Sequence, residues 1–262
     1  MTTAETPGRG APDRPDSPRE RLLQAARDVV AADGLEGLTL RAIARRAGVS
    51  HGAPLRHFPS LASLLAAVGA DGFVRLMDTV DEHLAAADGA AAEAGHVLGP
   101  RRRLTEAARA YVQFALTDPG VFSVTFRPEL VDVTDEEYQR QGAASFQQLV
   151  DLVEAVQADG WQPDHPSDQV AAVLWAQVHG LAVLALHGAL GAVVADHDGT
   201  RRGAGGPRSR PGEELPLRLA VLSTQLSIGD DPDPTDPPTH PPVEHRAPSD
   251  TERDERTEET TT

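Results

Sequence analysis

The chain has 262 residues and a formal net charge of −16 at pH 7, because 40 acidic residues face 24 basic ones, all of them arginine. Its 40% hydrophobic residues can fill a sizeable core. The absence of cysteine excludes disulfides, thiol catalysis and thiolate metal sites, and residues 1–16 lack the apolar stretch of a secretory signal, so we expect a cytoplasmic protein.

The charge is divided unevenly along the chain. Residues 17–58 carry seven arginines against four acids, whereas residues 229–262 carry eleven acids, three arginines and seven prolines. The second segment has too few apolar residues to offset its ordering entropy, so we expect a disordered acidic tail at 229–262. Residues 1–16 are predicted to be disordered as well, and the Gly/Arg/Pro-rich residues 199–212 to form a mobile loop.

Between these segments apolar residues recur at spacings of three and four, which predicts an all-α fold of about nine helices. The first helix begins at a capping box of Ser17 and Glu20 with Pro18 at the first helical position, and it ends at Gly34. Its inner face is expected to carry the apolar residues Leu22, Ala26, Val29 and Val30.

Two short helices follow, joined by a tight turn. Thr39 is expected to cap a helix through Ala47, Gly48 and Val49 form the turn, and Ser50 caps a third helix that ends near Phe58. A long fourth helix then begins after Pro59 and Ser60. Further helices are predicted over 100–117, 119–126, 134–159 with a capping box at Thr134, 167 to about 187, and 216–228.

Two short helices joined by a glycine turn, with arginines on the outer face, are typical of a helix-turn-helix that binds DNA. Gly48 supplies the backbone freedom of the turn and Val49 an apolar plug beneath it. A solvated charged face is the alternative interpretation of the arginines, but the turn between them favours DNA contact. The predicted DNA-binding residues are Thr39, Arg41, Arg45, Arg46, Ser50, His51, Gly52, Ala53, Leu55, Arg56 and His57.

The segment from Arg19 to Val68 resembles the DNA-binding domain of the TetR family of bacterial transcriptional regulators. The resemblance rests on Ala-Gly-Val-Ser at 47–50, on Gly52, and on His-Phe-Pro-Ser at 57–60. It implies that Ser50 to His57 is the recognition helix and that Thr39 contacts phosphate. Leu55 replaces a tyrosine that is usual in the family, and Leu61 a common lysine, so both departures are expected to weaken the grip on DNA.

Residues of roughly 100–190 resemble a C-terminal domain of the same family. The matching motifs are Tyr-Val-Gln-Phe at 111–114, Asp-Pro-Gly-Val-Phe at 118–122, Phe-Arg-Pro-Glu at 126–129, and Trp-Ala-Gln-Val-His-Gly-Leu at 175–181. The resemblance implies a helical domain for ligand binding and dimerisation over 66–228, after a DNA-binding domain at 17–65. The predicted pocket residues are Tyr111, Phe114, Phe122, Phe126, Phe146, Trp175 and His179.

Plain core packing is the alternative interpretation of these aromatic residues. For His179 three roles are open, in this order of preference: a core histidine, a hydrogen-bond donor at a dimer interface, and a ligand contact. A further alternative concerns residues 170–195, which contain no charge and are long enough to span a membrane. Gln177, two histidines and three glycines argue against a span, and a helix buried by its own domain and by a second subunit is the preferred account. An acidic interaction module that acts through the tail is the remaining rival.

The expected partners are therefore an operator in double-stranded DNA, a second copy of the chain, and an unidentified small molecule, with no membrane. The helix near Trp175 and the last helix are expected to form the dimer interface, through Ala176, Gly180, Ala182, Leu217, Val221 and Leu222. No nucleophile elbow, phosphate loop, dinucleotide fingerprint or zinc motif is present, so we expect no enzyme, cofactor or metal.

Overall fold

The computed structural model describes residues 17–190 and 211–229, and within these residues the chain contains nine α-helices, a short 3-10 helix and no strand. The elements are α1 Pro18–Asp33, η1 Leu35–Gly37, α2 Leu40–Arg46, α3 Pro54–His57, α4 Leu61–Glu93, α5 Pro100–Thr117, α6 Pro119–Thr125, α7 Glu136–Gln157, α8 Ser167–Leu186 and α10 Pro211–Ile228. The predicted all-α fold is confirmed for this part of the chain. The predictions for 1–16, for most of the loop at 199–212 and for the tail beyond Gly229 lie outside the described residues.

The first helix has the predicted start and end. The side chain of Ser17 accepts a hydrogen bond from the Glu20 amide, and the Glu20 carboxylate accepts one from the Ser17 amide. The helix ends before Gly34, whose φ of +69° lies in the region that favours glycine. All four residues of the predicted inner face are buried, and α1 packs against α2, α3, α4 and α6.

The third helix is shorter than predicted. Helix α3 begins at Pro54 rather than at Ser50, and Ser50 to Ala53 form a turn in which the Ala53 amide donates to the Ser50 carbonyl. Pro54 has no amide hydrogen to offer to a preceding turn, and its fixed φ suits a first helical position, so the helix begins there. Ser50 is therefore not the cap that the sequence suggested.

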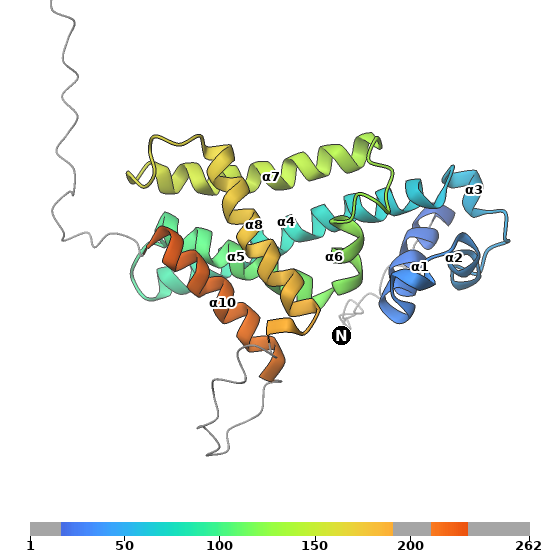
Figure 1. Cartoon of the computed structure of the whole chain (residues 1–262), viewed down its shortest axis with the longest axis horizontal. Helices are drawn as coiled ribbons and strands as arrows, with labels where there is room; N and C mark the ends of the chain where they lie inside the picture. Colours follow the sequence, from blue (N-terminus) through green and yellow to red (C-terminus); the bar gives the residue numbers. More distant parts are fainter. Residues whose placement is uncertain (1–16, 191–210, 230–262) are drawn as a thin grey trace, which may run out of the picture. The chain divides into compact units, whose positions relative to one another are not determined.

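Helix α4 has 33 residues and is therefore about 50 Å long. Figure 1 shows α1, α2 and α3 gathered near its first turns, and α5 to α8 along the rest. The glycines at 69 and 72 let other elements approach it closely. A Cβ on Gly72 would lie 2.0 Å from Thr125 Oγ1, and a Cβ on Gly69 would lie 2.8 Å from the Tyr138 ring.

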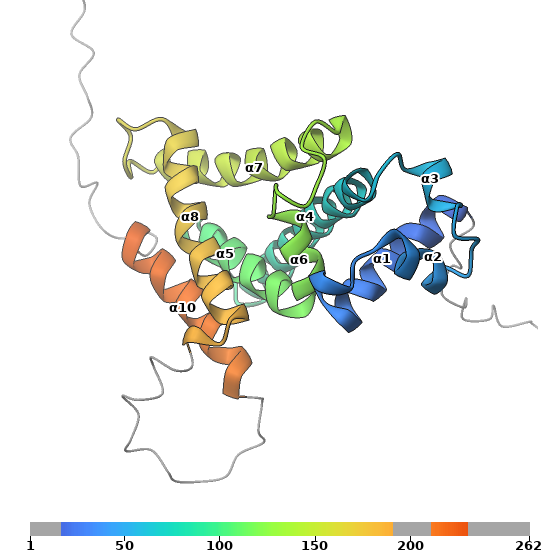
Figure 2. The ribbon, with the colours of Figure 1, turned by 45° about the vertical axis from the view of Figure 1, so that its right-hand side comes forward.

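Helices α5 to α8 and α10 form the body. Helix α5 packs against α4, α6, α7, α8 and α10, and the two views show it between α4 on one side and α8 and α10 on the other (Figures 1 and 2). Ten of its residues are buried. The central position of α5 explains why its apolar residues extend around most of the helix.

Two helix starts in the body differ from the prediction. Asp135, not Thr134, caps α7 by accepting from the Tyr138 amide, because Thr134 instead donates its amide and hydroxyl to the Asp132 carboxylate. Helix α10 begins at Pro211, so Pro216 lies inside it. Proline is common at the first position of a helix, and the prediction assigned that position to Pro216, whereas Pro211 occupies it.

Helix α8 is long and apolar enough to cross a membrane, with a mean hydropathy of 1.6, and it is the one such helix in the described part of the chain. A single helix of this kind is weak evidence for a span. One face, formed by Ala171, Leu174, Val178 and Ala182, is buried against the body. Among the described residues, the protomer thus covers one side of α8 and leaves the other side exposed.

Candidate functional site

The turn between α2 and α3 has the geometry of a helix-turn-helix. Gly48 has a φ of +66°, and the Val49 amide donates to the Ala44 carbonyl at 3.1 Å. Ile43 and Ala44 are buried under the turn, and Val49 packs against the same core. The turn is therefore held from inside by apolar contacts while its outer side remains free.

The outer side gathers nearly all of the predicted DNA-binding residues. Those that are exposed are Arg41, Arg45, Arg46, Ser50, His51, Gly52, Leu55, Arg56 and His57, together with Thr39 at the start of α2. Ala53 is half-buried. A Cβ on Gly52 would meet nothing within 4 Å, so packing within the protomer does not require a glycine there. The position is open to an external partner.

The arginines of this face are not equivalent. Arg46 forms an ion pair with Asp28 of α1 at 3.6 Å, which ties α2 to α1. Arg41, Arg45 and Arg56 form no ion pair with any described residue. These three guanidinium groups are therefore the unpaired cations of the face, and Arg46 has a partner that an anion would have to displace.

Helix α3 is fixed by its neighbours rather than by its length. Pro54 is buried, and the Arg19 guanidinium lies over the Phe58 ring, 5.1 Å from its centroid. Leu55 is 57% exposed, although it is a large apolar residue on a four-residue helix. Nothing in the protomer accounts for an exposed leucine at this place.

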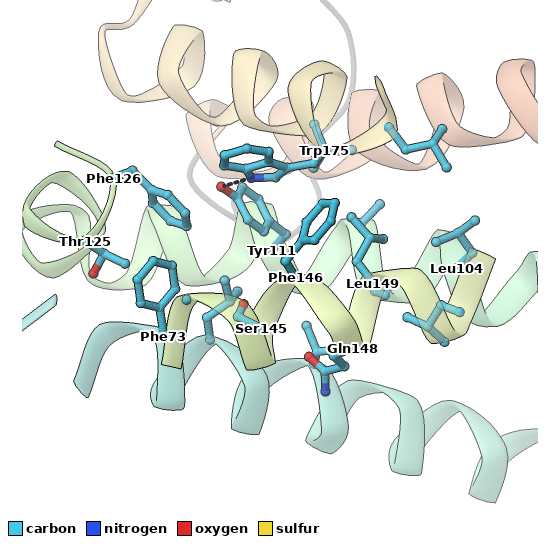
Figure 3. A pocket seen from close by; sticks show the side chains of 18 of the residues that line it. Phe73, Leu104, Tyr111, Thr125, Phe126, Ser145, Phe146, Gln148, Leu149 and Trp175 are labelled. Carbon is cyan, nitrogen blue, oxygen red and sulfur yellow. Dashed lines mark hydrogen bonds between the residues drawn. The ribbon is translucent and has the colours of Figure 1, made fainter. Parts of the chain in front are cut away.

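A cavity of about 340 Å³ lies in the body between α4, α5, α6, α7, α8 and α10. Figure 3 shows Phe73, Tyr111, Phe126, Phe146 and Trp175 around one part of it, and Leu104 and Leu149 at the other end. The lining residues are Phe73, Leu76, Val80, Leu104, Ala107, Ala108, Tyr111, Thr125, Phe126, Pro128, Tyr138, Gly142, Ser145, Phe146, Gln148, Leu149, Leu152, Leu174, Trp175, Val178 and Thr224. None of them carries a charge.

Of the predicted pocket residues, the structure places Tyr111, Phe126, Phe146 and Trp175 on the cavity wall. Three others do not line it. Phe114 and Phe122 are buried in the core behind the wall, where Phe122 packs edge-on against Tyr111. His179 lies behind Tyr111 as well, with its ring centroid 5.5 Å from that of Phe122.

Apart from Phe146, the wall residues on α4 and α7 were not predicted from the sequence. Phe73 comes from α4, and Tyr138, Ser145 and Gln148 come from α7. On α7 the lining residues recur with helical spacing from Tyr138 to Leu152, a signal that was present in the sequence. The spacing identifies a buried face, however, and does not say that a cavity lies beneath it.

Tyr111, Trp175 and His179 form a hydrogen-bonded group at the cavity. Trp175 Nε1 donates to the Tyr111 hydroxyl at 3.2 Å, and that hydroxyl lies 2.7 Å from His179 Nδ1. Burial lowers the pKa of His179 and raises the pKa of Tyr111, since it disfavours the charged form of each. Both side chains are therefore neutral near pH 7, and their mutual hydrogen bond orients them.

The expected dimer interface is only partly exposed. Ala176 and Leu222 are exposed, and Gly180 has open space where a Cβ would be. Ala182 is 0% exposed because it faces its own body, so its assignment to an interface was wrong. Leu217 is half-buried and packs against the protomer core, while Val221 remains half-exposed.

Other apolar residues of α8 and α10 lie open beside these. Val173 is 69% exposed and Leu226 79%. The two helices are joined by hydrogen bonds from Gln177 to the Ser223 carbonyl and from Ser227 to Gln177. This surface, formed by Val173, Ala176, Gly180, Leu184, Leu222 and Leu226, is called the α8/α10 face below.

The exposed residues of the helix-turn-helix named above are called the recognition face below. Ion pairs connect α1, α4 and α6 between this face and the cavity. Arg27 of α1 pairs with Asp71 of α4, and Arg75 of α4 pairs with Asp118, whose side chain also caps α6. A Cβ on Gly120 would lie 2.7 Å from Val30 Cγ1, which shows how closely α6 approaches α1. No group of three or more possible metal ligands occurs among the residues that the structure describes.

Two family models match the chain. Residues 22–68 match the family "Bacterial regulatory proteins, tetR family", and residues 104–202 match the "Tetracyclin repressor-like, C-terminal domain". The first match contains the helix-turn-helix, and the second begins inside α5 and contains α6, α7 and α8. Together the two matches cover more than half of the chain.

Individual proteins agree with these matches. The repressor AcnR of Corynebacterium efficiens is 34% identical over 71 residues, which are 27% of this chain and 38% of that protein, so the chain spans about two fifths of the length of this curated relative. A solved structure from Rhodococcus sp. RHA1, described as a protein of unknown function, is 30% identical with a TM-score of 0.59, and the match covers 82% of this chain and 96% of that one. A transcriptional regulator from the same organism has a TM-score of 0.50 at 23% identity, covering 82% and 99% of the two chains, a likeness of fold alone.

Proposed function

The chain belongs to the TetR family of bacterial transcriptional regulators, and we propose that it is a cytoplasmic repressor that binds a palindromic operator as a dimer and releases it when a small molecule binds in the body. The observation that carries the proposal is the turn at Gly48 beside three exposed arginines, Arg41, Arg45 and Arg56, that form no ion pair with any described residue. Such a basic face suits the phosphate backbone, and the exposed side chains of α3 suit base edges.

Dimerisation is supported by the α8/α10 face. It is apolar, no described residue of the protomer covers it, and its small residues Ala176 and Gly180 let a second helix approach closely. A two-fold axis would pair this surface with itself and would place two copies of α3 in successive major grooves, about 34 to 36 Å apart. The operator is then a palindrome whose half-sites are one helical turn apart.

Helices α1, α2 and α3 are called the head below. Release by a ligand is supported by the elements that connect the cavity to the head. Phe73 of the cavity wall is on α4, and Thr125 and Phe126 are at the end of α6, which packs against α1 through Gly120 and Val30. A ligand that fits the cavity better in one position of α4 and α6 shifts the population toward that position. If that position separates the two α3 helices wrongly for the operator, the ligand relieves repression.

The test begins with selection of DNA by the purified full chain from a random library, followed by sequencing. We expect an inverted repeat whose half-sites lie one helical turn apart. Binding of that sequence is then measured at several salt concentrations for the wild type and for a variant in which Arg41, Arg45 and Arg56 are replaced by alanine. Selection of no common sequence, or a variant with unchanged affinity and salt dependence, would overturn the proposal.

A further inference from the structure

The charge of the cavity wall restricts what it accepts. Its 21 lining residues include no Asp, Glu, Lys, Arg or His. The side-chain amide of Gln148, one of these lining residues, donates a hydrogen bond to the Asp81 carboxylate at 2.8 Å, and Asp81 itself does not line the cavity. A charged ligand would therefore give up its hydration without gaining an opposite charge.

The polar atoms on the wall are mostly committed to partners inside the protein. The Thr125 and Thr224 hydroxyls donate to carbonyls of their own helices, and the Tyr138 hydroxyl donates to the Thr125 carbonyl. The Trp175 indole and the Tyr111 hydroxyl bind each other, and Tyr111 also binds His179. These bonds leave an apolar surface toward the cavity.

Ser145 is the exception among the lining hydroxyls. No hydrogen bond joins its side chain to any described residue. Figure 3 shows it on α7 between Phe73 and Phe146, with the rings of Tyr111 and Trp175 across the cavity. A serine hydroxyl can both donate and accept, so it suits a neutral hydroxyl or carbonyl on the ligand.

We infer that the cavity takes an uncharged, mainly apolar ligand that bears one neutral hydrogen-bonding group, held near Ser145 among the aromatic side chains, with an aliphatic portion toward Leu104 and Leu149. Organic carboxylates and ammonium compounds of the same size are excluded. The inference rests on the proposed function in that the cavity is taken as the effector site, and it adds the chemical class of the effector.

Four probes of nearly the same size separate charge from hydrogen bonding: para-butylphenol, para-butylbenzoate, para-butylbenzylammonium and butylbenzene. Calorimetric titration of the full chain at pH 7 should show binding of the phenol, and at least about tenfold weaker binding of both ions. Butylbenzene should bind about fivefold more weakly than the phenol, because it leaves Ser145 without a partner. Equal or tighter binding of either ion would overturn the inference, as would no binding of the phenol up to its solubility limit.

Two variants locate the binding. Ser145→Ala should reduce the phenol to the affinity of butylbenzene and leave butylbenzene unchanged. Ala108→Phe should fill the cavity from α5 and abolish binding of both, and Ala108→Leu, a smaller change at the same place, serves if the phenylalanine variant does not fold. Binding that neither filled variant reduces would place the probes elsewhere and overturn the inference.

A separate measurement distinguishes failure of this inference from failure of the proposed function. The selected operator is titrated with the protein in the presence and absence of saturating phenol. If the phenol binds with the expected preference but leaves operator affinity unchanged, the ligand class stands and release by a ligand of this site does not. If operator binding is absent while the ligand preference holds, the repressor function alone fails.

Discussion

The recognition face and the cavity are built in opposite ways. The face lies within residues 39–57, one short stretch of chain, and most of the exposed residues in that stretch are polar or charged. The cavity draws uncharged residues from positions as far apart as Phe73 and Thr224, on six helices. A local stretch of sequence is enough to determine a surface like the recognition face. A cavity like this one is determined by how distant helices pack against one another.

The two regions should therefore respond differently to substitution. Arg41, Arg45 and Arg56 of the face are exposed and form no ion pair with any described residue, so their substitution should change DNA binding without changing folding. The cavity wall shares residues such as Phe126 with the core, so most of its substitutions affect stability too. A face substitution that destabilises the fold without affecting DNA binding would show that the assignment of the face to DNA binding is wrong.

Replacing Arg41, Arg45 and Arg56 by alanine should have the largest effect. In a dimer the change removes up to six phosphate or base contacts, which should weaken operator binding by roughly 1,000-fold and reduce the salt slope by about five. Fluorescence anisotropy at several salt concentrations measures both. Arg109, Arg127 and Arg140 of the body, all exposed, form the matched control: their triple alanine variant has the same charge and should keep the wild-type affinity and slope. Equal losses in the two variants would mean that total charge, not the face, binds DNA.

The contrast between the two regions also explains how far the sequence could predict them. The capping box at Ser17, the end of α1 at Gly34 and the turn at Gly48 follow from neighbours within four residues, and each was predicted and is present. The predicted start of α3 was wrong although a helix start also depends on nearby residues. Serine is a good cap, and the sequence does not show that Ser50 to Ala53 form a turn before Pro54.

The body is harder to predict, because whether one of its residues faces the core, the cavity or solvent depends on helices that are distant in the sequence. Helix α8 has no charged residue from Val170 to Leu186, so nothing in its sequence marks which side faces solvent. For that reason Ala182, which is buried, was grouped with Gly180, which has open space beside it. Likewise, no sequence pattern tells that Tyr111 faces a cavity while Phe114, one turn away, is enclosed by the core.

Gly180→Leu should have the second largest effect, and it acts on the body alone. The added side chain has open space in the protomer and improves helix propensity, so the protomer should fold at least as stably. At the proposed two-fold interface the same side chain would keep the helices apart. We expect a monomer by light scattering and about 10- to 100-fold weaker operator binding, because a single head contacts half of the site.

The control for this variant is Gly89→Leu. Gly89 lies inside α4, is exposed, and has no atom within 4 Å of a Cβ, so the change in propensity and in surface is the same. It should leave the protein dimeric with wild-type affinity. A Gly180→Leu protein that remains dimeric and binds the operator normally would place the interface away from the α8/α10 face.

Leu55 should have a smaller and more specific effect. An exposed leucine on α3 suits the methyl group of a thymine in the major groove. Replacing that thymine by uracil in one half-site removes one methyl group, which should weaken wild-type binding by about fourfold. The Leu55→Ala protein should bind the two DNAs equally. A scan of thymine-to-uracil changes across the selected operator measures this, and a scan without any position that depends on Leu55 would remove the leucine from direct readout.

The smallest expected effect is the dependence of stability on pH through His179. Burial lowers the pKa of this imidazole in the folded protein, and its ring contacts are with Tyr111, Phe122, Phe126 and Trp175, none of which offers a negative charge. The unfolded chain, with an ordinary histidine pKa of about 6.5, then binds the proton more readily. Stability should therefore fall as the pH drops below about 6.5, by less than about 1.4 kcal/mol per pH unit because the half-buried ring is partly screened by water.

In His179→Asn the amide oxygen can still accept from the Tyr111 hydroxyl, but the proton uptake is gone, so urea unfolding at pH 7.5 and 5.5 should show a smaller difference than in the wild type. His187→Asn, at an exposed position just after α8, should retain the wild-type difference. If His179→Asn retained it as well, the lowered pKa would not be linked to folding, and His179 would matter only as the acceptor that orients Tyr111 at the edge of the cavity.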